Sequence, residues 1–189
     1  GPTAQTNAPA FSPNGRSLVA VGEDRVVRLW DVSKVEEDGL LGVPRTIYLF
    51  HGFGLQGALT NVVYSPNGRV LAVGSNFGTC LLDSASGELL VHLEPSPFNA
   101  DVCSAFAFSD DGRYFVTGHS MNIRIYDLQA FWQSVETGEW PISENRRLEL
   151  EKALLEQSSS PQWTPVGTVM SLGFLPPREN RPLQLVVAE

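Results

Sequence analysis

The chain has 189 residues and a formal net charge of −8, and it is 42% hydrophobic and 18% charged, which suits one globular domain with a real core. The acidic balance and the lack of any Lys/Arg-rich block argue against a nucleic-acid-binding surface. No apolar run is long enough to cross a membrane and the first residues carry no secretory signal, so we expect an intracellular protein, cytoplasmic or nuclear, with no membrane attachment.

Three segments of the chain repeat one pattern, which is the strongest signal in the sequence. Each copy has an aromatic residue four positions before a turn glycine, then a short apolar run ending in a second glycine, then a run ending in aspartate. The residue before that aspartate lies eight positions after the second glycine in every copy. The copies are Phe11–Gly15, Leu18–Gly22 and Val27–Asp31; Tyr64–Gly68, Val70–Gly74 and Cys80–Asp83; and Phe108–Gly112, Tyr114–Gly118 and Ile123–Asp127.

The residue types in each copy explain why it should form strands and turns. Pro-Asn-Gly and Asp-Asp-Gly favour tight turns, because Asn and Gly tolerate the positive φ that such turns need. The run that follows the second glycine alternates, with Val27 and Leu29 on one face and Arg28 on the other. Such alternation is typical of a strand with one buried face. The pattern therefore predicts an all-β chain built from antiparallel hairpins.

These turns, together with the Trp30–Asp31 pair, resemble the WD-repeat family, and Leu82–Asp83 and Tyr126–Asp127 are substituted forms of the same pair. The resemblance implies WD-type β-propeller blades, each of four strands, arranged around a central channel. We expect blade 1 over about residues 3–50, blade 2 over about 58–93, blade 3 over about 102–142 and the start of blade 4 over about 166–189. The chain would then hold about three and a half blades.

A fourth copy begins at Val169–Phe174 and continues, after a widened turn, with a second strand over Leu183–Ala188. Propellers typically have about four to eight blades, and an open ring would leave strand edges exposed. We therefore expect further residues of the native chain, or another chain, to complete the ring. Two chains of this kind would together supply about seven blades, which is a permitted number.

Residues 128–165 form a long insertion between the third and fourth copies, and here the sequence predicts a helix. The helix is expected over Glu144–Gln157, which is rich in helix formers, with Ser143 as its N-cap. Leu150 and Leu154 lie on one narrow apolar stripe, which suits either a solvated helix packed loosely on the propeller or a helix that docks a partner. Aromatic residues bracket the insertion, either to pin it to the blade or to contact a partner: Phe131, Trp132, Trp140 and Trp163. The candidate contact residues of the insertion are Trp132, Trp140, Leu150 and Leu154.

Two motifs that are typical of enzymes are better explained by the repeat. Gly52–Gly57 matches the G-x-G-x-x-G loop of dinucleotide-binding proteins, but the repeat places a strand over 58–64, where a nucleotide site needs a helix. Gly118–Asn122 resembles a serine nucleophile elbow, but a strand follows it, so Ser120 falls in a hairpin. We expect no catalytic residue and no cofactor.

The cysteines and histidines give no sign of a metal centre. Cys80 and Cys103 form no CxxC pair, and their spacing from His51, His92 and His119 fits no zinc site. We expect two small buried thiols in a reducing compartment rather than a disulfide.

The expected function is that of a protein-interaction scaffold, a subunit or domain of a larger assembly whose rigid blades present variable loops to other proteins. By the resemblance, partners contact the loops before the innermost strands and between the second and third strands. The candidate partner-binding residues in these loops are Glu23, Arg25, His51, Phe53, Phe77, Phe98 and Met121.

Two other classes of function stay open, because fold alone does not decide among them. One is a propeller enzyme with a hydrolase or nucleotide site in its channel, in which His51 or His119 would have to converge with Ser120 or a carboxylate. The other is a regulatory sensor arm of a longer multidomain protein.

Overall fold

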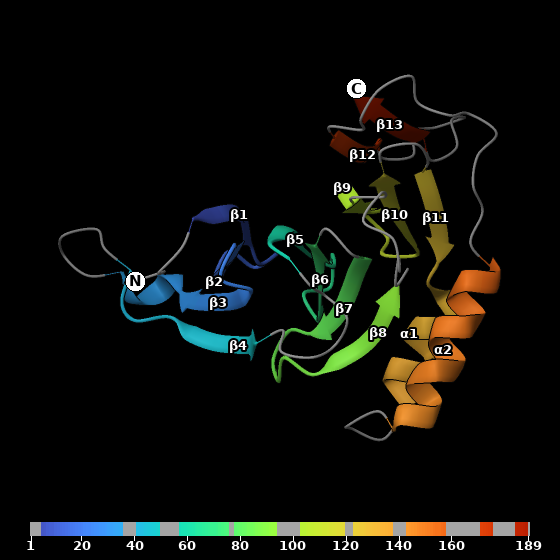
Figure 1. Ribbon diagram of the computed structural model, residues 1–189, viewed down its shortest axis with the longest axis horizontal. Helices are drawn as coiled ribbons and strands as arrows, with labels where there is room; N and C mark the ends of the chain where they lie inside the picture. The colour runs from blue at the N-terminus through green and yellow to red at the C-terminus, as the bar shows by residue number, and fades with distance from the viewer. Residues whose placement is uncertain are drawn as a thin grey trace.

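The structure is a computed structural model that describes residues 5–35, 41–49, 57–75, 78–93, 103–119, 123–137, 143–157, 171–175 and 184–188. Within them the strands form antiparallel sheets that follow one another in chain order (Figure 1). Two of the sheets have four strands each, and in both the spatial order of the strands is their order along the chain. The predicted all-β class and the propeller-blade organisation are therefore confirmed.

The bounds of the elements follow the repeats closely. Blade 1 consists of β1 (Thr6–Phe11), β2 (Ser17–Gly22), β3 (Val26–Asp31) and β4 (Arg45–Leu49), with the 3-10 helix η1 (Val32–Lys34) after β3. Blade 2 consists of β5 (Leu59–Tyr64), β6 (Val70–Ser75), β7 (Gly78–Asp83) and β8 (Leu89–Leu93). Blade 3 contains β9 (Cys103–Phe108), β10 (Tyr114–His119) and β11 (Ile123–Asp127), and is followed by α1 (Gln129–Thr137) and α2 (Glu144–Gln157). The last sheet pairs β12 (Ser171–Leu175) with β13 (Gln184–Ala188).

The four sheets lie along an open arc, and the first strand of each sheet lies on the inner side of that arc (Figure 1). These inner strands contact one another in sequence, β1 with β5, β5 with β9, and β9 with β12. The last strands of blades 1 and 2, β4 and β8, lie on the outer side. This is the radial arrangement that propeller blades adopt around a channel.

The hydrophobic core lies between neighbouring sheets, so a blade with neighbours on both faces is buried on both. In blade 2 all six residues of β6, Val70–Ser75, are buried. Leu71 and Val73 pack towards blade 1, whereas Val70 and Ala72 pack towards blade 3. A strand covered on both faces reads as a continuous apolar run, as Val70–Val73 does.

Blade 1 keeps one face open, which we call the end face of blade 1. Val19 and Val21 pack against blade 2, so their alternating neighbours point the other way. On that side Phe11 pairs with Leu18, and Leu18 pairs with Trp30, which makes one apolar row across three strands. The Phe11 side chain is 62% exposed.

The sheet of β12 and β13 has a similar open face at the other end of the arc. Leu172, Phe174 and Val187 pack against the core cluster of blade 3. Val186 points to the opposite side and is 46% exposed. A Cβ added at Gly173 would meet nothing within 4 Å. Both ends of the arc therefore carry an exposed apolar side chain, Phe11 at one end and Val186 at the other.

The insertion after blade 3 contains two helices, although the sequence predicted only one. α2 has the predicted bounds, Glu144–Gln157, and the Ser143 hydroxyl accepts a hydrogen bond from the Arg146 amide at 3.3 Å. α1 was not predicted. It begins because the Asp127 carboxylate accepts from the Gln129 amide at 3.0 Å, as an N-cap does.

The described residues contain three strands of blade 3, and the chain continues after β11 as a helix. The residues after β11 lack a run of β-branched residues and instead place Leu128, Phe131 and Val135 three and four positions apart. That spacing puts all three on one side of a helix. All three side chains are buried in the cluster between blades 2 and 3.

Candidate protein-interaction surfaces

The tight turns between the first and second strands form one edge of the blades, which we call the turn face. In blade 1 the Ser12 hydroxyl accepts from the Ser17 amide at 2.9 Å and donates to the Asn14 side chain at 2.8 Å. The Gly15 amide donates to the Ser12 carbonyl at 2.8 Å, and Gly15 has a positive φ of 69°. The turn is thus closed by side-chain and backbone bonds together.

The same network recurs in blades 2 and 3, with Ser65 and Ser109 in place of Ser12. In blade 3 the acceptor is Asp111 rather than an asparagine. The Ser109 hydroxyl and the Arg113 amide both donate to this carboxylate, and they hold its pKa below the ordinary value of 3.8. The repetition explains why Ser, Asn or Asp, and Gly are needed at fixed spacing in each copy.

Consecutive turns also contact one another along the turn face. A Cβ added at Gly68 would lie 3.6 Å from the Pro13 ring, and one added at Gly112 would lie 3.8 Å from the Pro66 ring. The proline of one turn therefore faces the glycine of the next. These contacts fix the spacing between neighbouring blades on this face.

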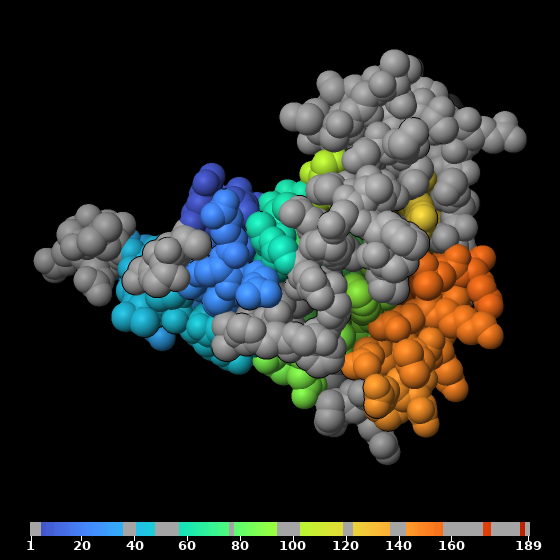
Figure 2. Space-filling model, viewed as in Figure 1, coloured from blue at the N-terminus to red at the C-terminus, as the bar shows by residue number. Residues whose placement is uncertain are grey.

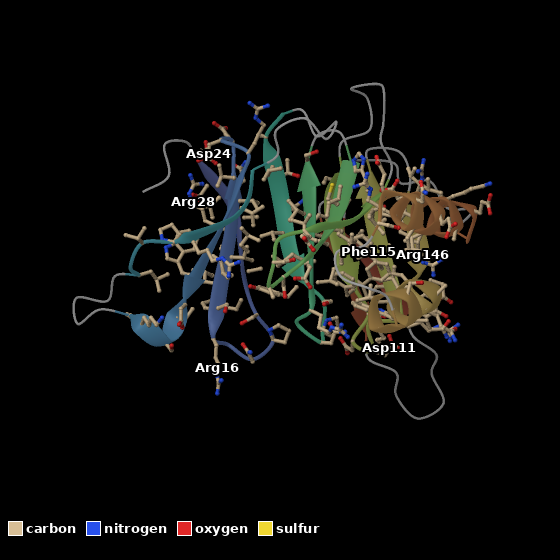
Figure 3. All side chains as sticks on the ribbon, turned by 90° about the horizontal axis from the view of Figure 1, so that it is seen from below. Arg16, Asp24, Arg28, Asp111, Phe115 and Arg146 are labelled. Carbon is tan, nitrogen blue, oxygen red and sulfur yellow. The ribbon has the colours of Figure 1, made fainter. Side chains whose placement is uncertain are left out.

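The hairpin tips between the second and third strands lie at the opposite edge, which we call the hairpin face. Figure 3 shows Asp24 and Arg28 at this edge and Arg16 and Asp111 at the turn face. The Arg28 guanidinium donates to both carboxylate oxygens of Asp24, with one bond of 3.1 Å. These hydrogen bonds are the main cause that lowers the pKa of Asp24.

Two of the candidate partner-binding residues flank this ion pair. Glu23 and Arg25 are both exposed at the tip of the hairpin. Arg25 has a φ of 61°, the only positive φ of a non-glycine residue in the described chain. A left-handed conformation costs an ordinary L-residue about 1–2 kcal/mol. The backbone of this tip is therefore held in a conformation that its own sequence disfavours.

The other loop candidates lie outside the described residues: His51, Phe53, Phe77, Phe98 and Met121. Of the insertion candidates, Trp140 also lies outside them, as does the flanking Trp163. The Gly52–Gly57 motif is described only at its last residue, and Ser120 is not described. The strands that the repeat predicted next to these motifs, β5 and β11, are both present.

The insertion is anchored to the blades through α1 and α2. The Trp132 indole N–H of α1 donates to the Gly112 carbonyl at 2.7 Å, which ties the helix to the turn of blade 3. Leu150 and Leu154 of α2 are buried in the cluster between blades 2 and 3. Figure 2 shows the two helices in orange as a block on the far side of blade 2 from blade 1.

α2 also reaches the outer strand of blade 2. The Glu151 carboxylate accepts a hydrogen bond from the His92 backbone amide of β8 at 2.7 Å. Arg146 of the same helix donates to the Ser134 hydroxyl of α1 at 2.7 Å. A backbone donor on the edge of blade 2 is thus satisfied by a helix from the insertion, which no repeat pattern in the sequence could have indicated.

The two cysteines are free and buried, as predicted. Burial is the main cause that raises the pKa of the Cys80 thiol well above its ordinary value, so the thiol stays protonated. Among the described residues, no group of three or more His, Cys, Asp or Glu side chains could hold a metal ion. In the same part of the chain, neither helix combines the length and the apolar character that a membrane span requires.

Comparison with known proteins points to one family. The family model "WD domain, G-beta repeat" matches residues 3–31 and 87–127. The chain is 29% identical over 123 residues to "Cross-pathway control WD-repeat protein 2" of Flammulina velutipes, a match that covers 64% of this chain and 34% of that protein. It is 30% identical over 114 residues to "Guanine nucleotide-binding protein subunit beta" of Oryza sativa subsp. japonica, covering 58% of this chain and 27% of that protein.

The chain therefore spans about a third or less of the length of these curated relatives. The matches and the blade architecture agree with the repeats read from the sequence, because both matched ranges end at the aspartate that closes a copy, Asp31 or Asp127. The chain is therefore similar to WD-repeat proteins over these residues.

Proposed function

We propose that this chain is part of a scaffold that holds other proteins together, and that partners dock on the hairpin face at Glu23 and Arg25. The observation that carries this site is the left-handed backbone of Arg25. Strained residues persist where the surrounding structure holds them, and they are concentrated at sites that bind or react. The conformation of Arg25 is held by local contacts, since Arg28 and Asp24 on either side of it in the chain form an ion pair.

The geometry of the tip suits recognition of another protein. The Arg25 amide donates to the Gly22 carbonyl at 3.2 Å, which closes the turn and leaves the two charged side chains outside it. A rigid loop loses little conformational entropy when it binds, so more of the contact energy contributes to affinity. Exposed Arg is among the residues that interfaces favour.

Membership of a larger assembly is the second part of the proposal. One relative is named as a beta subunit of a guanine nucleotide-binding protein, which is a component of an assembly. We propose that further blades, from the rest of the native chain or from another chain, cover the two open sheet faces. The apolar row of Phe11, Leu18 and Trp30 and the exposed Val186 support this, because such faces are stable when packed on another sheet.

The proposed role is non-catalytic, and the proposed compartment is intracellular. The two buried free thiols support a reducing compartment. Nucleic acid and membrane are not among the proposed partners, since the chain carries a net charge of −8 and scaffold binding needs neither.

Affinity purification from native lysate tests the scaffold proposal. The full-length protein is tagged and compared with a Glu23→Lys/Arg25→Asn variant, because asparagine tolerates the left-handed conformation that Arg25 adopts. Lys152→Gln, a change of an exposed cation on α2, is the matched control. We expect stoichiometric protein partners that the wild type and the control retain and that the double variant loses. A folded protein with no stoichiometric partner would contradict the scaffold proposal. Equal capture of partners by the wild type, the control and the double variant would contradict the hairpin site alone.

A further inference from the structure

A cleft of about 570 Å³ opens on the turn face between blades 1 and 2. Its apolar walls include the two turn prolines, Pro13 and Pro66, together with Leu29. Asn14 and Asn67 line it from the same turns. None of the side chains that line the cleft carries a formal charge, so the charge of the surrounding rim decides which ligand it favours.

Exposed arginines lie beside the cleft, next in the chain to residues that line it. Arg16 and Arg69 follow the glycines of the two turns and are exposed. Neither guanidinium has an ion pair or a side-chain hydrogen bond with any residue in the described part of the chain. Arg45 of β4 adds a third cation, since its guanidinium donates to the carbonyl of Ala85, a cleft-lining residue, at 2.8 Å.

Nearby carboxylates do not neutralise these arginines. The Asp83 side chain accepts from the Ala85 and Ser86 amides of its own turn. Asp31 accepts from the Ser33 amide and hydroxyl and pairs with Lys34 at 3.3 Å. Two arginines without an ion pair among the described residues therefore lie beside one uncharged cleft, in a protein whose net charge is −8.

In blade 3 the equivalent arginine is paired within the protein. Arg113 occupies the position of Arg16 and Arg69 in its turn, but it donates two hydrogen bonds to the Asp127 carboxylate, at 2.9 and 3.2 Å. The turn of blade 3 is also covered, because the Trp132 indole lies against Gly112 and bonds its carbonyl. Only at the junction of blades 1 and 2 do unpaired arginines and an uncovered cleft occur together in the described structure.

The floor of the cleft offers one more donor. Tyr64 is largely buried and lines the cleft, and its hydroxyl has no hydrogen-bond partner among the described residues. Burial raises the pKa of Tyr64 to about 12. The phenol therefore stays protonated at neutral pH and can donate to an acceptor in the cleft.

We propose that this cleft binds an extended acidic segment of a partner protein. Carboxylates of the segment pair with Arg16 and Arg69 on the rim, and its chain lies between Pro13 and Pro66 over Tyr64. Arginine suits this role because its planar guanidinium pairs with a carboxylate through two bonds. The site lies on the turn face, opposite the hairpin tip, so one scaffold would hold two partners on its two faces.

Peptide selection on the full-length protein tests this site. Random peptides of about a dozen residues, displayed on phage, are selected against the immobilised protein, and the enriched peptides are synthesised with a fluorescein label. Affinity is measured by fluorescence polarisation against the wild type, Arg16→Ala/Arg69→Ala, Ala85→Trp to fill the cleft, and Arg25→Asn as the control on the hairpin face. The melting temperature of each variant shows that it is folded.

We expect the enriched peptides to be rich in Asp and Glu and their affinity to fall with added salt. The double arginine variant and the cleft-filling variant should each weaken binding by about tenfold or more, and Arg25→Asn should leave it unchanged. Peptides without acidic enrichment, or acidic peptides that bind the double arginine variant as tightly as the wild type, would overturn the proposal. Loss of partners through Arg25 alone would not affect it, so the two sites fail separately.

Discussion

Truncation of Leu154 tests whether α2 is an integral part of the blade core. Its side chain is 2% exposed and lies in the cluster that joins blades 2 and 3. A buried Leu→Ala change costs both the lost burial and the cavity that remains, about 3 kcal/mol at such a site. For a chain of this size that lowers the melting temperature by about 6 to 12 °C.

The control for this change lies on the same helix. Leu148 is 53% exposed, so Leu148→Ala makes the same chemical change with the same small gain in helix propensity but almost no loss of packing. We expect it to change the free energy of unfolding by about 0.5 kcal/mol or less. The difference between the two variants then isolates the docking of α2 from its intrinsic helicity.

Two measurements report on the Leu154 variant. Denaturant unfolding followed by tryptophan fluorescence gives the change in the free energy of unfolding. Hydrogen exchange of the His92 amide reports local release of α2, because that amide donates to Glu151. Leu154→Ala should speed its exchange and Leu148→Ala should not. Equal stability and equal exchange rates in the two variants would refute the view that this helix is docked, and would favour a loosely packed, solvated helix.

Three further changes probe single contacts. Trp132→Phe removes the indole donor to the Gly112 carbonyl and should cost about 1 to 2 kcal/mol in denaturant unfolding; an unchanged midpoint would contradict the anchoring of α1. The pKa of Asp111 is lowered chiefly by the Ser109 hydroxyl, so its contribution to stability is present above about pH 4 and is lost as the pH falls through the folded value. Asp111→Asn should therefore make the acid limb of stability less steep in pH-dependent melting, and an unchanged limb would argue against it. Arg25→Gly relieves a left-handed φ of 61°, so it should raise the free energy of unfolding by about 1 kcal/mol and with it the melting temperature. A lower melting temperature would show that Arg25 is not strained.

The blades could be predicted from the sequence because each copy carries its own local signals. Asn14–Gly15 fixes a turn by backbone preference, and the alternating run after Gly22 fixes a strand with one buried face. α2 was equally predictable, since Ser143 and a run of helix formers mark its start and its length. These features depend on residues close together in the chain.

The features that were missed depend on contacts between distant residues. α1 was not predicted because only the run of helix formers over Glu144–Gln157 was taken as helical within the insertion, yet the spacing of Phe131 and Val135 was a usable helical signal. The bond between Glu151 and the His92 amide joins residues 59 positions apart, so no local pattern encodes it. The cleft on the turn face likewise requires two turns to be placed side by side, which only the packing of one blade on the next provides.

The proline–glycine contacts along the turn face give the array a direction. The proline ring of each turn contacts the glycine of the next turn, Pro13 at Gly68 and Pro66 at Gly112. The residues of each turn are therefore complementary to those of the turn in the following blade. Blade 3 breaks the series, because Asp110 stands where the earlier copies have proline. Exchanging turns between blades would therefore disturb two junctions for every turn moved. Although the copies look alike in sequence, their order along the chain is part of the structure that they encode.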